Sequence, residues 1–280
     1  MRIAYGFWRY GPGEERLARE MIACARDLGV DHFDTADVYG APAQFGASEE
    51  LLGNLRRADP SLFDGASVAT KVGVRLGTPY DSSPEHLSAA IDASLRRLRL
   101  DCVDLLYIHR PDMLTHPSET AAALDRAIRA GKAKAVGASN FSTHQVEALA
   151  TFLDAPLAAH QLEFSALAPD AATDGRLDQA MAAALSVYAW SPLAGGRIID
   201  GGDRQATGAR EALQAVAAMT GVSLGAAALG FTLAHPAGMT PIVGTRSASR
   251  LTELAKADGM GMSRADWYAV YEAATGRKLP

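Results

Sequence analysis

Cysteine is almost absent from this sequence, and that absence excludes two classes of protein. Cys24 and Cys102 are the only cysteines among 280 residues. Each lies in or beside an apolar periodic segment, which suits a small buried hydrophobic residue better than a disulfide. No Cys/His cluster has the spacing of zinc ligands. We therefore expect neither a disulfide framework nor a metal site.

Long apolar segments are also absent. The longest weakly polar run, Val222 to Ala234, is shorter than the roughly 20 residues that a membrane-spanning helix needs. The stretch from Met1 to Gly6 contains no apolar core of the kind found in signal peptides. We expect a cytoplasmic protein that does not contact a membrane.

The sequence has no excess of positive charge. The net charge is −5 and the pI is about 5.8, and the Lys and Arg residues are scattered along the chain. A nucleic-acid partner normally requires a clustered basic surface. These properties exclude nucleic acid as a partner and leave a small molecule as the expected ligand.

Apolar runs of strand length alternate with helical periods along the whole chain. Nearly half of the residues are apolar (48%), enough for a large core. The expected strands are Ile3 to Phe7, His32 to Asp34, Ser67 to Thr70, Val103 to Ile108, Ala133 to Ala138, Leu157 to Ala159, Leu185 to Ala189 and Thr240 to Val243. Helical periods follow each strand, and Ser48, Ser83, Ser142, Ser247 and Ser263 are placed as helix caps or starts.

The eight strand and helix units predict a (β/α)8 TIM barrel that spans residues 1–280 as a single domain. Strands that are apolar on both faces belong in a parallel sheet with helices outside. An open doubly wound sheet is the alternative. It would normally carry a glycine fingerprint after its first strand if it bound a dinucleotide, and the segment from Gly6 to Gly11 does not fit that pattern.

Polar residues close most of the predicted strands. They are Asp34, Lys71, His109, Ser139 with Asn140, Gln161, Trp190 and Gly244. Taken singly, Lys71 is a solvated strand end and His109 an ordinary rim histidine. A closed barrel brings the carboxyl ends of all its strands to one rim, where barrel enzymes carry their chemistry. Packing alone does not require polar groups at the same end of every strand, so we interpret the set as a candidate site.

One pairing within this set has a chemical use. Asp34 ends the second strand and Tyr39 follows one loop later. A phenol with an ordinary pKa of about 10 needs a cationic neighbour to exchange a proton near neutrality, and that cation needs a counter-charge. Asp34 can supply the counter-charge. Alternatively, Asp34 only caps the strand end and Tyr39 only packs on the turn.

With these residues in place, the sequence resembles the aldo-keto reductase family from Ile3 almost to the C-terminus. The segments 33–40, FDTADVYG, and 136–141, VGASNF, carry the resemblance when found together. It implies a barrel that binds NADPH without a separate dinucleotide domain. It also implies a catalytic set of Asp34, Tyr39, Lys71 and His109, in which Lys71 lowers the pKa of Tyr39 and His109 donates to the substrate oxygen.

The resemblance further implies which residues contact the cofactor. The nicotinamide contacts are Ser139, Asn140, Gln161 and Trp190; the pyrophosphate loop includes Ser191, Pro192 and Leu193; the adenosine-phosphate end includes Gly244, Thr245, Arg246, Arg250 and Glu253. Leu254 stands where the family usually has Asn, so one adenine contact differs. Trp8 and Arg110 are candidate substrate contacts. Arg110 either binds an anionic substrate group or forms an ion pair with Asp112 or another acidic residue of the rim.

The implied activity is reduction of an aldehyde or ketone to an alcohol, with Tyr39 as general acid and NADPH as hydride donor. Two alternatives stay open. The same residues serve a dehydrogenase that oxidises a sugar or alcohol, and a nucleotide-sensing regulatory subunit with little turnover keeps the same cofactor site. The sequence does not select the substrate, the direction of reaction or the oligomeric state.

Overall fold

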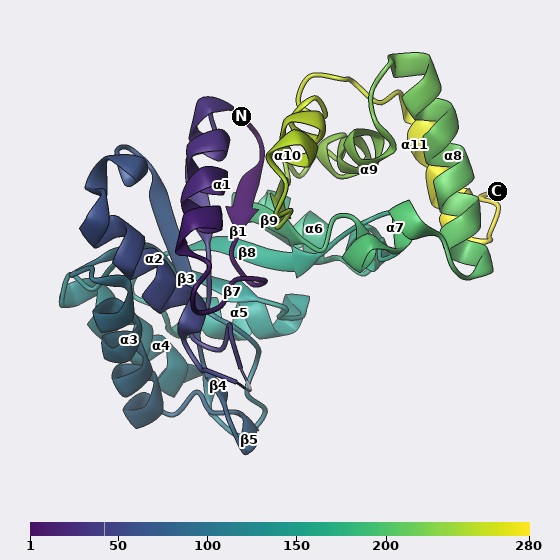
Figure 1. Cartoon of the computed structure of the whole chain (residues 1–280). Helices are drawn as coiled ribbons and strands as arrows, with labels where there is room; N and C mark the ends of the chain where they lie inside the picture. The colour runs from purple at the N-terminus through teal and green to yellow at the C-terminus, as the bar shows by residue number, and fades with distance from the viewer. Residues whose placement is uncertain (42) are drawn as a thin grey trace. The chain divides into compact units, whose positions relative to one another are not determined.

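In the computed structural model, which describes residues 1–41 and 43–280, eight parallel strands form a closed barrel. Figure 1 labels the helices and strands along the chain. Around the barrel they follow the order β1, β10, β9, β8, β7, β6, β3, β2. Their bounds are β1 Ala4–Gly6, β2 His32–Asp34, β3 Ser67–Val72, β6 Val103–Ile108, β7 Ala133–Ser139, β8 Leu157–Glu163, β9 Ser186–Trp190 and β10 Thr240–Val243. The predicted barrel fold is confirmed.

The chain divides into two compact units. Residues Tyr5–Gln161 form one, called here the N-terminal unit. Residues Met1–Ala4 together with Leu162–Pro280 form the other, called here the C-terminal unit. The organisation of residues 1–280 as a single domain stays a prediction, and each unit is described by itself.

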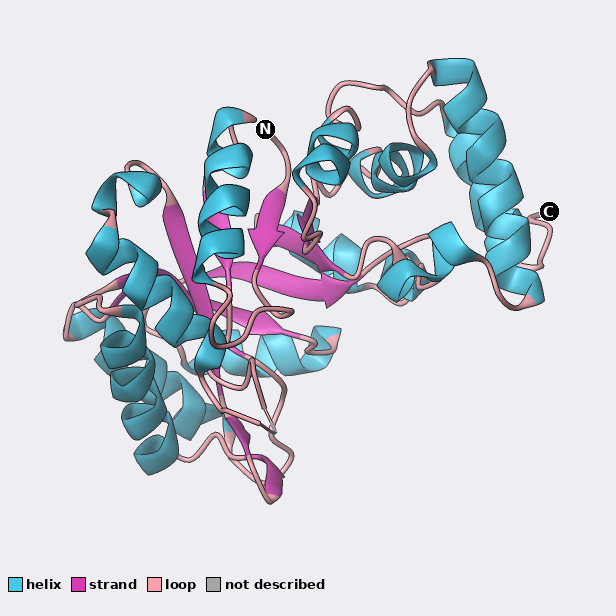
Figure 2. Ribbon diagram, in the orientation of Figure 1, coloured by secondary structure: helices cyan, strands magenta, loops and turns pink. Residues whose placement is uncertain are grey.

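In the N-terminal unit, helices flank the parallel strands (Figure 2). They are α1 Glu15–Asp27, α2 Ala47–Ala58, α3 Pro84–Leu98, α4 Pro117–Arg129 and α5 Thr143–Phe152. The predicted starts of α3 and α5 are confirmed. Ser83 lies directly before Pro84 and accepts a hydrogen bond from the His86 amide. Ser142 forms a reciprocal capping box with Gln145.

The predicted cap of α2 is wrong. The helix begins at Ala47, and Gly46 occupies the cap position in a left-handed conformation (φ 84°). A Cβ at Gly46 would lie 2.3 Å from Nε of Arg97, so only glycine fits there. Ser48 therefore lies inside the first turn, and its hydroxyl group bonds to the barrel instead.

A short antiparallel hairpin in this unit was not predicted. Strands β4 (Val74–Arg75) and β5 (Thr78–Tyr80) pair between β3 and α3. Strands of two and three residues are too short to show a hydrophobic period. The available signal was the pair of glycines, Gly73 and Gly77, which both have positive φ.

The C-terminal unit contains β9, β10 and the remaining helices. These are α6 Arg176–Ala182, α7 Arg197–Asp200, α8 Arg204–Thr220, α9 Leu224–Leu233, α10 Ala248–Ala255 and α11 Arg264–Thr275. A column of stacked rings, Phe164, Phe231, Trp267 and Tyr271, joins α9 to α11, with centroids 4.7–5.8 Å apart. Ser247 and Ser263 cap α10 and α11, as predicted.

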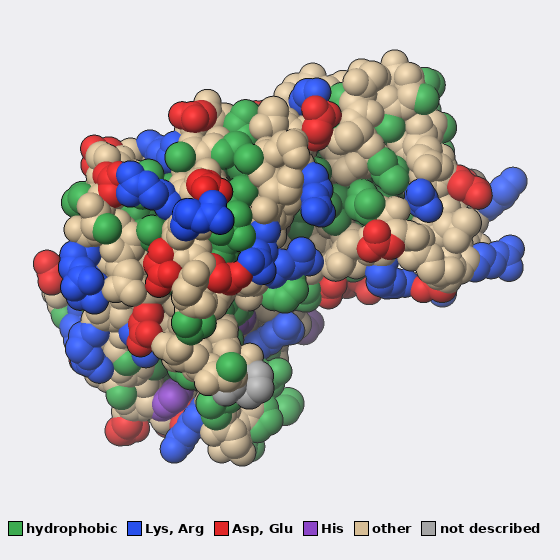
Figure 3. Space-filling view, viewed as in Figure 1, with side chains coloured by type: hydrophobic (Ala, Val, Ile, Leu, Met, Phe, Trp, Pro, Cys, Tyr) green, Lys and Arg blue, Asp and Glu red, His purple; other side chains and the backbone are tan. Residues whose placement is uncertain are grey.

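The sequence predicted that no segment is long enough to span a membrane and that basic residues do not cluster. Among the described residues, no single helix combines the length and the apolar composition that a bilayer crossing requires; α8 and α9 meet that requirement only as a pair bent by 97°. On the face drawn in Figure 3, acidic and basic side chains are interspersed.

Candidate active site

The centre of the candidate site is a buried ion pair between β2 and β3. Lys71 Nζ lies 2.6 Å from Asp34 Oδ1, and the two side chains are 0% and 3% exposed. The parallel pairing of β2 with β3 brings the ends of the two strands together. Because side chains alternate along a strand, Lys71 turns to the side opposite its neighbour Thr70. A charged pair this deeply buried is stable only when both members are fully hydrogen-bonded.

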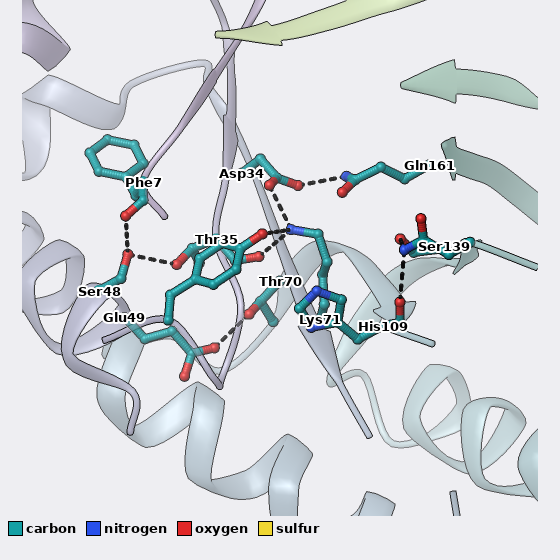
Figure 4. A network of polar contacts seen from close by, with 12 residues as sticks. Phe7, Asp34, Thr35, Ser48, Glu49, Thr70, Lys71, His109, Ser139 and Gln161 are labelled. Atoms are coloured by element: carbon teal, nitrogen blue, oxygen red, sulfur yellow. Dashed lines mark hydrogen bonds and ion pairs between the residues drawn. The ribbon is translucent and has the colours of Figure 1, made fainter. Parts of the chain in front are cut away.

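Both members meet that requirement. The Lys71 ammonium donates to Asp34 Oδ1, to the Thr35 carbonyl oxygen at 2.8 Å and to the Tyr39 hydroxyl oxygen at 3.2 Å (Figure 4). These acceptors use all three of its N–H groups. The second oxygen of Asp34 accepts from Gln161 Nε2 at 2.8 Å. Folding alone therefore fixes the Asp34, Lys71 and Tyr39 side chains as one unit.

The environment sets the protonation of this group. Burial lowers the pKa of Lys71, but Asp34 and Tyr39 outweigh it, so the pKa lies above its ordinary value and Lys71 stays charged. Burial raises the pKa of Tyr39. Lys71 lowers it, as expected from the sequence, but does not overcome burial, so Tyr39 is protonated at neutral pH.

His109 follows β6 and faces Tyr39. The two rings are 5.8 Å apart and nearly perpendicular, at 82°. Burial, with the charges of Lys71 and Arg110, holds the pKa of His109 well below its ordinary value. A neutral imidazole has one N–H donor, and Nδ1 of His109 has no partner among the described residues. His109 is therefore neutral at neutral pH, and its ring lies against that of Tyr39.

Ser139 and Asn140 lie at the end of β7. Asn140 adopts a left-handed conformation (φ 61°), which asparagine tolerates better than most residues. Its side-chain amide donates to the His109 carbonyl oxygen at 3.2 Å and to Ser139 Oγ at 2.9 Å. Gln161 is adjacent, because its backbone carbonyl accepts a hydrogen bond from the backbone amide of Asn140. The strand ends predicted from sequence thus meet in one place within this unit.

Trp8 and Arg110 are the candidate substrate contacts. Trp8 follows β1, is 54% exposed, and has the Arg9 guanidinium 4.6 Å from its ring centroid. Arg110 lies close enough to Tyr39 and His109 to lower both pKa values.

The predicted alternative for Arg110 was an ion pair with Asp112. The Asp112 carboxylate accepts from the Ser82 amide, the Leu114 amide and the Thr115 hydroxyl at 2.6–2.9 Å. These three donors hold the Asp112 carboxylate in the loop that follows His109.

The remaining predicted residues lie in the C-terminal unit. Trp190 ends β9, and Ser191, Pro192 and Leu193 form the turn that follows. Ser191 has a left-handed φ of 51°, and its carbonyl accepts from the Ala194 amide at 2.7 Å. Left-handed non-glycine residues are uncommon and cluster at ligand-binding sites.

The segment after β10 leads into α10. Gly244 and Thr245 are partly buried, and Arg246 is exposed. Thr245 Oγ1 accepts from the Ser247 amide at 3.3 Å. Arg250 is exposed in the first turn of α10, whereas Glu253 pairs with Lys256 at 2.7 Å. This segment presents two exposed guanidinium groups near a helix N-terminus, an arrangement that suits a phosphate.

The described structure adds residues that the sequence interpretation missed. The Thr35 carbonyl accepts from Lys71, and Glu49 accepts from Thr70 Oγ1 at 2.5 Å and from Arg97 Nε at 2.7 Å. Glu49 is fully buried although glutamate normally lies at the surface. The available signal was the position of Glu49 on the apolar face of α2.

Comparison with known proteins identifies the family. The Aldo/keto reductase family model matches residues 2–273. The chain belongs to the aldo/keto reductase family. The members of this family are oxidoreductases that use nicotinamide cofactors, so the chain is an oxidoreductase acting on carbonyl or alcohol groups.

Individual aldo/keto reductases similar to this chain have named activities. The chain is 44% identical over 282 residues to a 6-dehydroglucose reductase of Novosphingobium aromaticivorans, covering 99% of this chain and 93% of that protein. It is 35% identical over 291 residues to a 6-dehydroglucose reductase of Agrobacterium fabrum, covering 99% and 95%. The structure of a glycerol dehydrogenase from Gluconobacter oxydans matches with a TM-score of 0.86 at 27% identity, covering 98% of this chain and 91% of that one.

Proposed function

We propose that this protein reduces an aldehyde or ketone to an alcohol with NADPH, and that Tyr39 is the general acid. The observation that carries the proposal is the hydrogen bond of 3.2 Å between Lys71 Nζ and the Tyr39 hydroxyl, within an ion pair that folding alone assembles. A buried ammonium beside a phenol has a chemical use when the phenol gives up a proton.

NADPH, when bound, would supply the hydride chemistry at the carbonyl carbon. Tyr39 gives its proton to the carbonyl oxygen, and the adjacent Lys71 charge stabilises the phenolate that remains. Asp34 keeps Lys71 charged and directed at Tyr39. Neutral His109 donates a hydrogen bond to the same oxygen and so orients the carbonyl group.

The pKa directions agree with this assignment. A raised pKa keeps Tyr39 protonated at neutral pH, the form that a general acid needs. Reduction should therefore fall as pH rises through the pKa of Tyr39. Oxidation of an alcohol needs the phenolate and should rise over the same range.

The residues of the C-terminal unit fit a phosphorylated nicotinamide cofactor. Exposed Arg246 and Arg250 and the Thr245 hydroxyl stand at the start of α10, and none of the described acidic side chains forms an ion pair with Arg250. These groups would hold the 2′-phosphate that distinguishes NADPH from NADH. In this unit, Trp190 would contact the nicotinamide, and Ser191, Pro192 and Leu193 the pyrophosphate. In the N-terminal unit, Ser139, Asn140 and Gln161 are the proposed nicotinamide contacts.

The names of two relatives suggest the first substrate to test, which is 6-dehydroglucose. The exposed ring of Trp8 suits a sugar, because aromatic rings present large apolar contact areas. A second function, oxidation of a polyol, is favoured by the similarity to a glycerol dehydrogenase and needs the same four catalytic residues. The cytoplasmic location stays a prediction.

The test is the Tyr39→Phe variant, assayed with NADPH and either 6-dehydroglucose or a simple aldehyde. General acid catalysis is typically worth about 10²–10⁴-fold, so kcat should fall by that factor while the Kd for NADPH is unchanged. A variant that reduces the aldehyde at the wild-type rate would end the assignment. If the wild type binds NADPH tightly but turns over no aldehyde, ketone or polyol, the regulatory alternative replaces it.

A further inference from the structure

A second layer of hydrogen bonds lies behind the Lys71 and Tyr39 pair, at the start of α2. Ser48 and Glu49 are both 0% exposed, and neither is needed for the proposed proton transfer. Two consecutive buried polar residues on a helix are costly unless each polar group has a partner. The partners of these two lead to the two members of the catalytic pair.

Ser48 leads to Tyr39 and to the backbone that holds Lys71. Its amide donates to the Tyr39 carbonyl oxygen at 3.4 Å. Its hydroxyl donates to the Phe7 carbonyl oxygen at 3.0 Å and lies 2.9 Å from Thr35 Oγ1 (Figure 4). The carbonyl of that same Thr35 accepts from Lys71 Nζ.

Glu49 leads to the strand that carries Lys71. One carboxylate oxygen accepts from Thr70 Oγ1 at 2.5 Å, directly before Lys71 on β3. The other accepts from Arg97 Nε on α3 at 2.7 Å. The Arg97 side chain also packs against Gly46, and its guanidinium carbon lies 5.9 Å from the centroid of the Phe45 ring. Arg97 therefore contacts the two residues that come directly before α2.

We propose that Ser48 and Glu49 are positioning residues that set the distance between Lys71 and Tyr39. The Ser48 amide holds the Tyr39 backbone, and the Ser48 hydroxyl holds Thr35, whose carbonyl accepts from Lys71. Glu49 holds β3 next to Lys71 through its hydrogen bond with Thr70. The consecutive residues Ser48 and Glu49 thus contact the backbone on both sides of the 3.2 Å hydrogen bond between Lys71 and Tyr39. The inference rests on the proposed function, because the contact matters only if Tyr39 transfers a proton.

The distance has a measurable consequence in the pH profile. Lys71 lowers the pKa of Tyr39, so moving Lys71 away raises that pKa further. In the reductive direction the protonated phenol is active. The alkaline limb of the kcat profile should then move to higher pH, whereas a loss of stability alone would leave that limb in place. Asp37, Arg97 and Lys71 are the other charged groups around Glu49, and the variants below leave all three in place.

The test is Thr70→Val, which removes the hydroxyl that bonds to Glu49 and keeps the side-chain shape. We expect kcat to fall about tenfold, since a 1 Å misplacement of catalytic groups costs up to about 10²-fold. The alkaline limb should move up by about one pH unit, with KM and the Kd for NADPH unchanged. Thr70→Ser should restore both kcat and the limb.

Two further variants complete the experiment. Thr232→Val removes a buried hydroxyl that has no partner among the described residues, and should change neither kcat nor the limb. Ser48→Ala keeps the amide that bonds to Tyr39 and removes the hydroxyl that contacts the Phe7 carbonyl oxygen and Thr35 Oγ1. It tests the same distance through Thr35, whose carbonyl accepts from Lys71, should Thr70→Val fail to fold, and should shift the limb in the same direction.

The outcomes separate this inference from the proposed function. If Tyr39→Phe is inactive while folded Thr70→Val and Ser48→Ala keep the wild-type kcat and pH limb, positioning by Ser48 and Glu49 is overturned and the proposed function stands. If Tyr39→Phe is as active as the wild type, the proposed function fails and this inference fails with it. A lowered melting temperature with an unchanged pH limb also overturns positioning, because it shows a purely structural role.

Discussion

The N-terminal and C-terminal units hold their candidate site residues in opposite ways. In the N-terminal unit, Asp34 and Lys71 are almost completely buried and their polar atoms are paired within the fold. In the C-terminal unit, Arg246 and Arg250 are exposed on a loop and a helix. The proposed catalytic geometry is therefore part of the folded state, whereas the proposed phosphate contacts are side chains at the surface. Substitutions in the two units should consequently differ in what they change.

The largest expected effect is that of Lys71→Met, which should damage both stability and activity. It leaves Asp34 buried without its cation, and breaking a buried ion pair typically costs about 3–5 kcal/mol. Turnover should fall by at least about 10²-fold. Urea unfolding gives the free energy, and steady-state kinetics gives kcat. Lys132→Met is the control, because its pair with Asp92 is partly exposed, at 35% and 40%, and should contribute about 0–1 kcal/mol. Equal unfolding free energies for the two variants would show that the buried Asp34–Lys71 pair contributes no more to stability than the Asp92–Lys132 pair.

Arg250→Ala should weaken NADPH binding without affecting the fold. Loss of one charge-assisted hydrogen bond, about 1.5–3 kcal/mol, raises the Kd for NADPH about ten- to a hundredfold. The Kd for NADH and the melting temperature should not change, since Arg250 is exposed. Fluorescence titration with both cofactors measures this, with Arg264→Ala as an exposed arginine control. Equal loss of affinity for NADPH and NADH would show that Arg250 does not bind the 2′-phosphate.

Arg110→Met should reveal whether the substrate carries an anion. If the guanidinium binds a carboxylate or phosphate, kcat/KM for an aldehyde bearing that group should fall about tenfold or more, and a matched neutral aldehyde should be unaffected. An equal fall for both substrates would assign Arg110 to loop positioning. No fall for either would place it outside the site.

The smallest effect concerns stability alone. Asp37 is buried, and no side-chain donor among the described residues bonds to its carboxylate oxygens. Burial, then the nearby Glu49, raises the pKa of Asp37 well above its ordinary value, against the lowering effects of Arg97, the Val38 amide and Lys71. The folded state therefore holds a proton that the unfolded state releases above about pH 4.

Stability should consequently decrease as pH rises from about 4 through the raised pKa of Asp37. Asp37→Asn should remove this part of the slope. Urea unfolding at a series of pH values measures it, and an unchanged slope in Asp37→Asn would show that Asp37 is ionised in the folded state.

The strand ends were predictable from sequence because each is a local transition from an apolar run to a polar residue. Asp34, Lys71, His109 and Asn140 follow this pattern, and the structure brings them together. The contact between Gln161 and Asp34 was not predictable, because it joins residues 127 positions apart. Ser48 looks like a helix cap locally, but Gly46 takes that role and the barrel takes the hydroxyl. The sequence also did not predict that the pKa of Tyr39 is raised, because the effect of burial exceeds the lowering effect of Lys71.

The most direct test of this account is a single-turnover measurement with saturating NADPH on the wild type, Tyr39→Phe and Arg250→Ala. The account predicts that Tyr39→Phe reduces the carbonyl about 10²–10⁴ times more slowly than the wild type. Arg250→Ala should match the wild-type rate once NADPH is saturating, because its defect lies in binding. A wild-type rate in Tyr39→Phe, or equally slow reduction in both variants, would contradict the proposed separation between Tyr39, which transfers a proton, and Arg250, which binds the cofactor.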